Sequence, residues 1–188
     1  ADASSLIGSG HIMRCKTLAD ELQRRGAGVR IICRDHPSSF VTSLRDTGYT
    51  VATLSAPLPA HKKMQGYAAW LGVTQDEDAT QTIAALEGFT PDCLVVDHYA
   101  LDQNWEDQVR PHARQILVID DLANRPHNCD FLLDQNWFGD STEHRYDGLI
   151  PENCQRLLGP RYALLHPMFA KLRKHLSPRD GTIRRVLV

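Results

Sequence analysis

The chain has 188 residues, of which 42% are hydrophobic and 23% are charged, and this length suits one domain or one domain with a fragment of another. Lys and Arg number 21 against 23 Asp and Glu, which gives a net charge of -2. This balance, without a long run of either sign, disfavours a nucleic-acid or polybasic membrane partner and leaves a small neutral or anionic ligand.

The first predicted element is an amphipathic helix at 11–25, which ends at Gly26. Its apolar positions recur at helical spacing: Ile12, Cys15, Leu18, Ala19 and Leu22. Short apolar runs then alternate with amphipathic segments along the chain. In chain order we predict a strand at 29–33, a helix at 38–46, a strand at 49–54, a loop at 55–66, a helix at 76–87, a strand at 93–96, a helix at 103–112 that turns Trp105 and Val109 inward, and strands at 116–119 and 131–133.

Continuously apolar strands that alternate with helices are typical of a parallel sheet covered on both faces, so the predicted fold class is α/β, a Rossmann-like doubly wound sheet. Such a sheet places a buried strand before its glycine turn, whereas 1–7 is too polar to be one, and we expect the opening strand to be missing. A fresh strand begins at 183–188. We therefore expect a domain at 1–176 and, at 177–188, a linker and the start of a truncated second domain.

A glycine turn, Gly8-Ser9-Gly10-His11, opens the first predicted helix. The glycines let the backbone approach a ligand, and the free N–H groups of the helix start favour an anion or an oxygen-rich substrate. The turn is not a full G-x-G-x-x-G, because Met13 stands at the last glycine position, and it is not a P-loop, so no cofactor is predicted. The alternative is a tight strand-to-helix turn with a capping role.

His11 is the most informative residue of this turn. At a helix N-terminus the dipole disfavours the imidazolium, so we expect a neutral ring that can accept a proton from water. The alternative is a surface histidine in a turn.

Topology brings further polar residues toward His11. In a doubly wound sheet, ligands bind at the carboxyl ends of strands where the winding reverses, between the first and fourth strands of a 3-2-1-4-5 order. The glycine turn and the loop after 93–96 should therefore face one crevice, with the end of 116–119 beside them. This crevice would collect an imidazole, a phenol and carboxylates: His11, Asp97, His98, Tyr99, Asp120 and Asp121. For Asp97 and Asp120 the alternative is strand-end capping.

No metal site is predicted. Asp76 and Asp78 have the D-x-D form of some metal-dependent glycosyltransferases, but they start a polar helix, where acidic residues favour the dipole. His127 and Cys129 lack a second pair at zinc-ligand spacing. Neither G-x-S-x-G nor H-E-x-x-H occurs.

The longest apolar runs are strand-sized, too short to span a bilayer. The 5 cysteines are odd in number and contain no C-x-x-C pair, which fits reduced thiols better than disulfides. We therefore predict a cytoplasmic protein with neither a membrane nor a nucleic-acid partner. A monomer is expected, although no sequence pattern specifies the oligomeric state.

The stretch IGSGHIMRC at 7–15 resembles the UDP-2,4-diacetamido-2,4,6-trideoxy-β-L-altropyranose hydrolases of pseudaminic acid biosynthesis. Its G-x-G-H-x-x-R element is specific in combination with the D-H-Y of 97–99. Further similar segments follow in the family's order at 120–121, 127–130 and 159–165, so the resemblance covers nearly the whole chain.

This resemblance implies the N-terminal half of a GT-B architecture, which holds the sugar and the catalytic residues, while the C-terminal half of the same chain would hold most of UDP. It implies metal-independent hydrolysis, with inversion, of the bond between the anomeric carbon and the UDP oxygen. His11 falls on the family's catalytic histidine and Tyr99 on its D-H-Y tyrosine, so both are expected to be catalytic. The residues expected to bind substrate are Asp2, Gly8, Ser9, Gly10, Arg14, Asp97, His98 and Asp121.

Without the uridine and diphosphate contacts of the second domain, this segment alone is expected to be inactive. One competing interpretation is a GT-B glycosyltransferase similar to the enzyme that adds N-acetylglucosamine in peptidoglycan synthesis. Such enzymes dock on the membrane through a concentrated basic or apolar patch. Here the basic residues are scattered: Arg24, Arg25, Lys62 and Lys63. The sequence is also compatible with a non-catalytic nucleotide-sugar-binding module and with a polysaccharide biosynthesis protein that shares the fold but takes another substrate.

Overall fold

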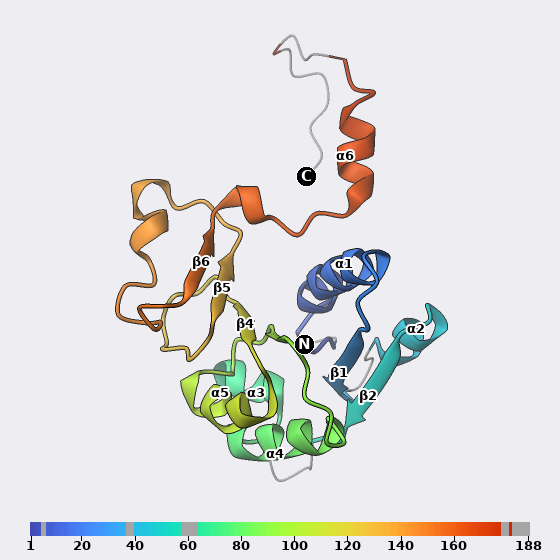
Figure 1. Ribbon diagram of the computed structural model, residues 1–188, viewed down its shortest axis with the longest axis vertical. Coiled ribbons are helices and arrows are strands. Elements are labelled where there is room, and N and C mark those ends of the chain that lie inside the picture. Colours follow the sequence, from blue (N-terminus) through green and yellow to red (C-terminus); the bar gives the residue numbers. More distant parts are fainter. Residues whose placement is uncertain (5–6, 37–39, 58–63, 178–180, 182–188) are drawn as a thin grey trace.

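The computed structural model describes residues 1–4, 7–36, 40–57, 64–177 and 181. Figure 1 shows helices and strands alternating along most of the chain. The helices are α1 (Gly10–Arg24), α2 (Val41–Asp46), α3 (Gly66–Leu71), α4 (Gln75–Ala85), α5 (Gln103–Val109) and α6 (Pro167–Arg173). The strands are β1 (Arg30–Arg34), β2 (Thr50–Leu54), β3 (Leu94–Val96), β4 (Ile116–Ile119), β5 (Phe131–Asp134) and β6 (Gln155–Leu158).

The predicted elements are present with small shifts in their bounds. The helix expected at 38–46 corresponds to α2, and positions 38–39 lie outside the described residues, as does the strand expected at 183–188. Sequence patterns missed α3, α6 and β6, since α3 and α6 are shorter than two turns and β6, with the sequence QRLL, has no β-branched residue.

The described strands form two separate parallel sheets. One pairs β1 with β2, and the other has the order β3-β4-β5-β6. The α/β class with parallel strands is confirmed, but no strand of the described residues joins β1 to β3 into one sheet. In residues 1–4, beside β1, the N-terminal ammonium lies 3.4 Å from the Ile32 oxygen, and an Asp2 carboxylate oxygen accepts a hydrogen bond from the Arg34 N–H (2.7 Å). Two such contacts do not constitute a ladder.

Each sheet has its own cluster of buried apolar side chains. In the larger cluster, Trp105 and Val109 of α5 pack with Val118 and Leu132, so the predicted inward orientation of α5 is confirmed. Burying such side chains contributes about 1.5–3 kcal/mol each. The smaller cluster joins α1 to α2 and to the residue before β2: Ala3, Ile12, Ala19, Leu44 and Tyr49.

A buried ion pair connects the two sheets. The Arg34 guanidinium at the end of β1 donates to the Asp78 carboxylate of α4 (2.6 Å), which also accepts a hydrogen bond from the Trp105 indole of α5 (2.9 Å). Breaking such a buried pair costs about 3–5 kcal/mol. Asp78 is therefore used within the interior, in agreement with the structural interpretation of the D-x-D sequence.

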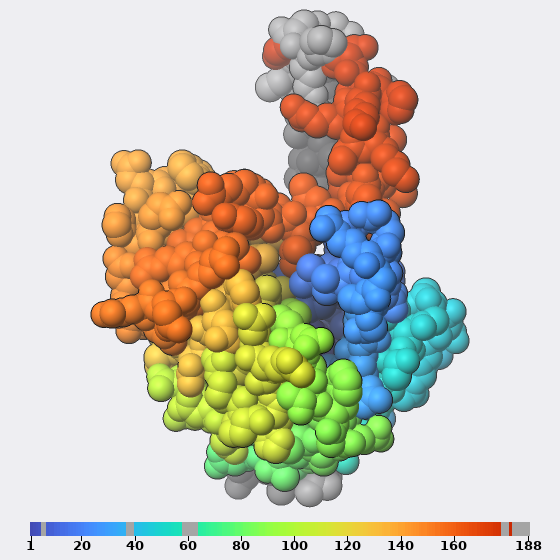
Figure 2. Space-filling view, viewed as in Figure 1, coloured from blue at the N-terminus to red at the C-terminus, as the bar shows by residue number. Residues whose placement is uncertain are grey.

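Helix α6 projects from the rest of the molecule, as Figures 1 and 2 show. Its apolar side chains, with those just before and after it, are more than half exposed: Leu165, Met168, Phe169, Leu172 and Leu176. Among the described helices, none has the length and apolar character needed to cross a membrane.

Candidate active site

The glycine turn places the His11 ring in the interior at the start of α1. Gly8 has a φ of 81°, a left-handed conformation that favours glycine, and its N–H donates to the Ser4 oxygen (2.8 Å). Ser9 is the N-cap residue, but its side chain makes no capping hydrogen bond. Helix α1 then begins at Gly10, and only 6% of the His11 surface is exposed. The turn is tight, as the capping interpretation expects, and it also aims the imidazole inward.

His11 meets the carboxylate that follows β3. The Asp97 side chain is fully buried, and its Oδ1 lies 2.6 Å from the His11 Nδ1. Arg14 lies one turn further along α1 and donates two hydrogen bonds to the same carboxylate, from Nε to Oδ2 and from Nη2 to Oδ1, both of 2.6 Å. The prediction that the glycine turn and the loop after β3 lie together is therefore confirmed.

These contacts determine which His11 nitrogen is free. Burial favours a raised pKa for Asp97, but the hydrogen bonds from Arg14 and His11 outweigh it and hold the pKa at about 2. An ionised carboxylate can only accept, so the His11 Nδ1 carries a hydrogen, and in the neutral form of the ring the lone pair is therefore on Nε2. The Arg14 Nη2, 3.3 Å from Nδ1, is then a neighbour of the ring rather than a donor to it. We call this arrangement the His11–Asp97 pair.

Tyr99 lies edge-on against His11, with 4.6 Å between the ring centroids. Burial, and then a hydrogen bond to the Asp121 carboxylate, raise the pKa of Tyr99. The phenol therefore keeps its proton at neutral pH. Asp121 also lies 3.4 Å from the Arg14 Nη1, so one cluster contains His11, Arg14, Asp97, Tyr99 and Asp121.

Two aromatic residues of α3 complete this cluster. Tyr67 lies 5.0 Å from Tyr99 and 4.9 Å from Trp70, and Trp70 lies 6.3 Å from His11, all measured between ring centroids. Tyr67 was not among the predicted site residues, because nothing local in the sequence indicates which loop α3 covers. Because α3 itself was not predicted, the position of Tyr67 and Trp70 on one helix face was not expected.

Asp2 and His98, expected to bind substrate, lie in the interior beside β1. The Asp2 Oδ2 is 3.6 Å from the His36 Nε2 and 3.8 Å from the His98 Nε2. The His98 Nδ1 accepts a hydrogen bond from the Ala100 N–H (3.0 Å). The structure thus brings Asp2 and His98 together, whereas the hydrogen-bond partner of the Tyr99 phenol is Asp121.

We expect His98 to make the stability depend on pH. Burial lowers the pKa of His98 to about 4, although Asp2 opposes this effect. The unfolded chain takes up a proton below about pH 6.5, whereas the folded chain does so only near pH 4, so the free energy of unfolding falls as the pH drops between these values. Urea unfolding at pH 7, 6 and 5 should show a slope of up to about 1.4 kcal/mol per pH unit. His98→Asn, which keeps an acceptor for the Ala100 N–H, should remove this slope, and an unchanged slope would contradict the role of His98.

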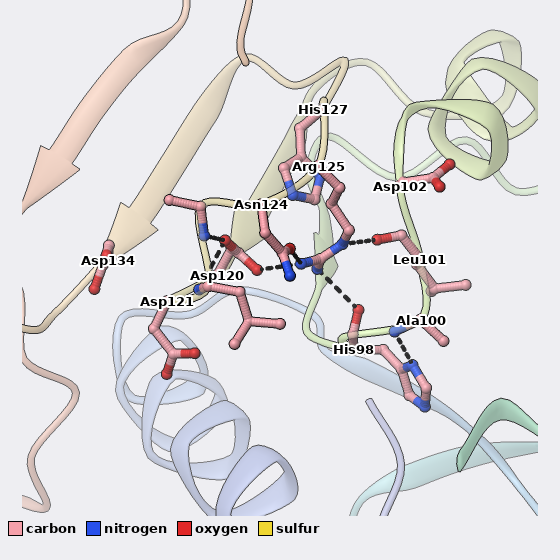
Figure 3. A network of polar contacts seen from close by, with 12 residues as sticks. His98, Ala100, Leu101, Asp102, Asp120, Asp121, Asn124, Arg125, His127 and Asp134 are labelled. Carbon is pink, nitrogen blue, oxygen red and sulfur yellow. Dashed lines mark hydrogen bonds and ion pairs between the residues drawn. The ribbon is translucent and has the colours of Figure 1, made fainter. Parts of the chain in front are cut away.

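Arg125 joins the loops that follow β3 and β4, as Figure 3 shows. Its Nε donates to the Leu101 oxygen (2.7 Å), and its Nη1 lies 2.8 Å from the Asp120 Oδ1. The other Asp120 oxygen accepts hydrogen bonds from the N–H groups of Leu122 and Ala123 (3.1 and 2.9 Å). Asp120 therefore caps the strand end, which was the alternative interpretation of this residue. No local sequence pattern indicated this role of Arg125.

The residues considered for metal binding have other partners. The His127 Nδ1 lies 2.7 Å from a carboxylate oxygen of Glu106, and both side chains are buried. Among the residues that the structure describes, no group of three or more His, Cys, Asp or Glu side chains has the arrangement of a metal site.

The fold and the cluster define a class: an α/β protein with parallel strands, in which loops at the strand ends and the start of a helix surround a carboxylate-bound imidazole. No family model matches the chain. The chain is similar to the UDP-2,4-diacetamido-2,4,6-trideoxy-beta-L-altropyranose hydrolase of Campylobacter jejuni subsp. jejuni serotype O:2, with 26% identity over 170 residues. The match covers 90% of this chain and 51% of that protein, so the chain spans about half the length of this curated relative. The predicted resemblance is confirmed as a distant similarity.

Proposed function

We propose that the protein hydrolyses UDP-2,4-diacetamido-2,4,6-trideoxy-β-L-altropyranose to UDP and the free sugar, a step of pseudaminic acid biosynthesis, without a metal and with inversion at the anomeric carbon. The His11–Asp97 pair is the observation that carries the proposal, and the similarity to a hydrolase of this substrate supports it. UDP is a good leaving group. The reaction therefore needs mainly an oriented water, a base on the face opposite UDP, and donors for the developing diphosphate charge.

In this mechanism the Nε2 of His11 takes a proton from water while the water oxygen bonds to the anomeric carbon. The bond from that carbon to the UDP oxygen breaks, and its electron pair leaves with the diphosphate. Asp97 holds the Nδ1 hydrogen and stabilises the imidazolium that forms. The Tyr99 phenol donates its hydrogen to Asp121, and its oxygen accepts a hydrogen bond from the water or from a sugar hydroxyl. A positioned base of this kind contributes about 10²–10⁴-fold in rate.

The surroundings of the pair have supporting roles. Gly8, Ser9 and Gly10 are exposed and leave room for the sugar beside the free N–H groups at the start of α1. Residues 1–176 form the sugar-binding and catalytic half of a GT-B protein, and UDP is held mainly by a second domain whose start, with the linker, lies at 177–188. The length of the curated relative, of which this chain matches about half, supports this division.

An NMR time course on the full-length protein with the UDP-diacetamido sugar in H₂¹⁸O tests the proposal. We expect UDP and free sugar to appear without an acceptor, with EDTA present, with ¹⁸O in the sugar and with the first-formed anomer inverted. A requirement for an acceptor hydroxyl would indicate a glycosyltransferase. Binding without turnover would indicate a nucleotide-sugar-binding module, and either result would overturn the hydrolase.

A further inference from the structure

The strongest feature outside the proposed catalytic groups is an aromatic surface beside them. It consists of Tyr67 and Trp70 on α3 and Tyr99 after β3, which we call the aromatic wall. Tyr67 and Tyr99 meet at 62°, and Trp70 and Tyr99 at 32° with 5.9 Å between centroids. The three rings contact one another at an angle and do not form a flat stack. They therefore present both ring faces and ring edges to one region next to the imidazole.

The aromatic wall is not part of the hydrophobic core. Tyr67 is 39% exposed, and Trp70 and Tyr99 are only partly buried. Trp105 shows the contrast, since it is buried and its indole N–H bonds to the Asp78 carboxylate. Within the described part of the chain, neither the Trp70 indole N–H nor the Tyr67 hydroxyl donates a hydrogen bond to another side chain, so both can meet a ligand. Aromatic groups with an apolar body and a polar tip are common in binding sites.

We propose that the aromatic wall is the subsite that selects an acetamido, deoxy sugar over a hydroxyl-rich hexose, an inference that rests on the proposed function. The methyl groups of two acetamido substituents and of a deoxygenated C6 are apolar, and their burial against rings is favourable. The electron-rich ring faces also attract C–H groups. A hydroxyl-rich hexose would instead place polar groups against these rings and lose hydrogen bonds to water.

The position of the wall fits this role. Trp70 lies 6.3 Å from His11 and Tyr99 4.6 Å, between ring centroids, so a sugar held on the wall has its anomeric carbon within reach of water at the imidazole. Tyr99 belongs both to the wall and to the cluster around Asp97. Tyr67 and Trp70 touch neither Asp97 nor Arg14 in any described hydrogen bond, which allows their contribution to be tested separately from catalysis.

Variants of the two α3 residues test this inference in the full-length protein. Tyr67→Ala and Trp70→Ala should raise KM for the UDP-diacetamido sugar and lower its kcat/KM relative to UDP-N-acetylglucosamine by about 10-fold or more. Tyr67→Phe and Trp70→Phe, which keep a ring, should retain most of the preference. Phe89→Ala is the matched control, because Phe89 is an exposed aromatic residue that precedes β3, at the opposite end of this strand from Tyr99.

A second readout does not depend on turnover. Saturation-transfer NMR with the free diacetamido sugar should give its strongest signals on the acetamido and C6 methyl protons, and these should weaken in Trp70→Ala but not in Phe89→Ala. An unchanged substrate preference together with unchanged methyl signals would overturn the aromatic wall while leaving hydrolysis intact. If the unaltered protein fails to hydrolyse the UDP-sugar, the proposed function itself fails, and the methyl signals alone decide whether the wall binds such sugars.

Discussion

Replacing His11 with Asn is expected to lower kcat for the UDP-diacetamido sugar by about 10²–10⁴-fold, the usual contribution of a positioned base. The asparagine amide can take the place of Nδ1 and still donate to Asp97, but it offers no basic atom where Nε2 stood. The substrate should therefore bind almost as well as before. Release of UDP measures kcat, and calorimetric titration measures the dissociation constant.

The control is the same substitution at His112, an exposed residue that precedes β4 and so lies away from the strand ends of the site. His112→Asn should leave turnover and binding unchanged. Near-normal turnover in His11→Asn would remove the base role from this residue.

Asp97→Asn is expected to lower kcat by about 10²–10⁴-fold as well, because an amide can donate to Nδ1 and so favour the tautomer with a hydrogen on Nε2. The fully buried carboxylate contacts His11 and Arg14 through both of its oxygens, so we propose that it positions the imidazole, whereas a direct contact with substrate was the expectation from the sequence. Hence KM should change little. Arg14→Lys keeps the charge but loses the bidentate hydrogen bonding to Asp97, so it should cause a smaller fall in kcat.

Loss of a buried ion pair also destabilises the fold, by about 3–5 kcal/mol. For this reason the number of binding sites per chain should be measured for Asp97→Asn by titration, so that kcat refers to folded protein. A large rise in KM with little change in kcat would instead assign Asp97 to direct contact with the sugar.

Local sequence patterns predicted most of the helices and strands, and they also predicted that His11 and Asp97 lie close together. The helical spacing of Ile12 and Ala19 indicated α1, and the continuous apolar run at 116–119 indicated a strand covered on both faces. The proximity of His11 and Asp97 followed from a general property of parallel sheets, whose strands end at the same edge. These inferences succeeded because each depends on periodicity or on chain direction.

The remaining features depend on pairs that are distant in the sequence. Arg14 and Asp97 are both polar residues near a turn, and no local signal indicates that one is fully occupied by the other. The same holds for Arg125, which bonds to a carbonyl 24 positions away, and for Tyr67, whose partner rings come from another loop. The separation into two sheets was not visible either, because apolar runs specify strands but not which strand pairs with which.

The His11–Asp97 pair crosses the boundary between the two sheets. The helix that carries the imidazole packs on the smaller apolar cluster, and the carboxylate follows a strand of the larger one. A small rigid-body displacement of one half against the other would lengthen this contact before it disturbed either backbone ladder. We therefore expect the proposed activity to depend on how the two halves are aligned, and to be lost in mild denaturant or on heating before the cooperative unfolding transition.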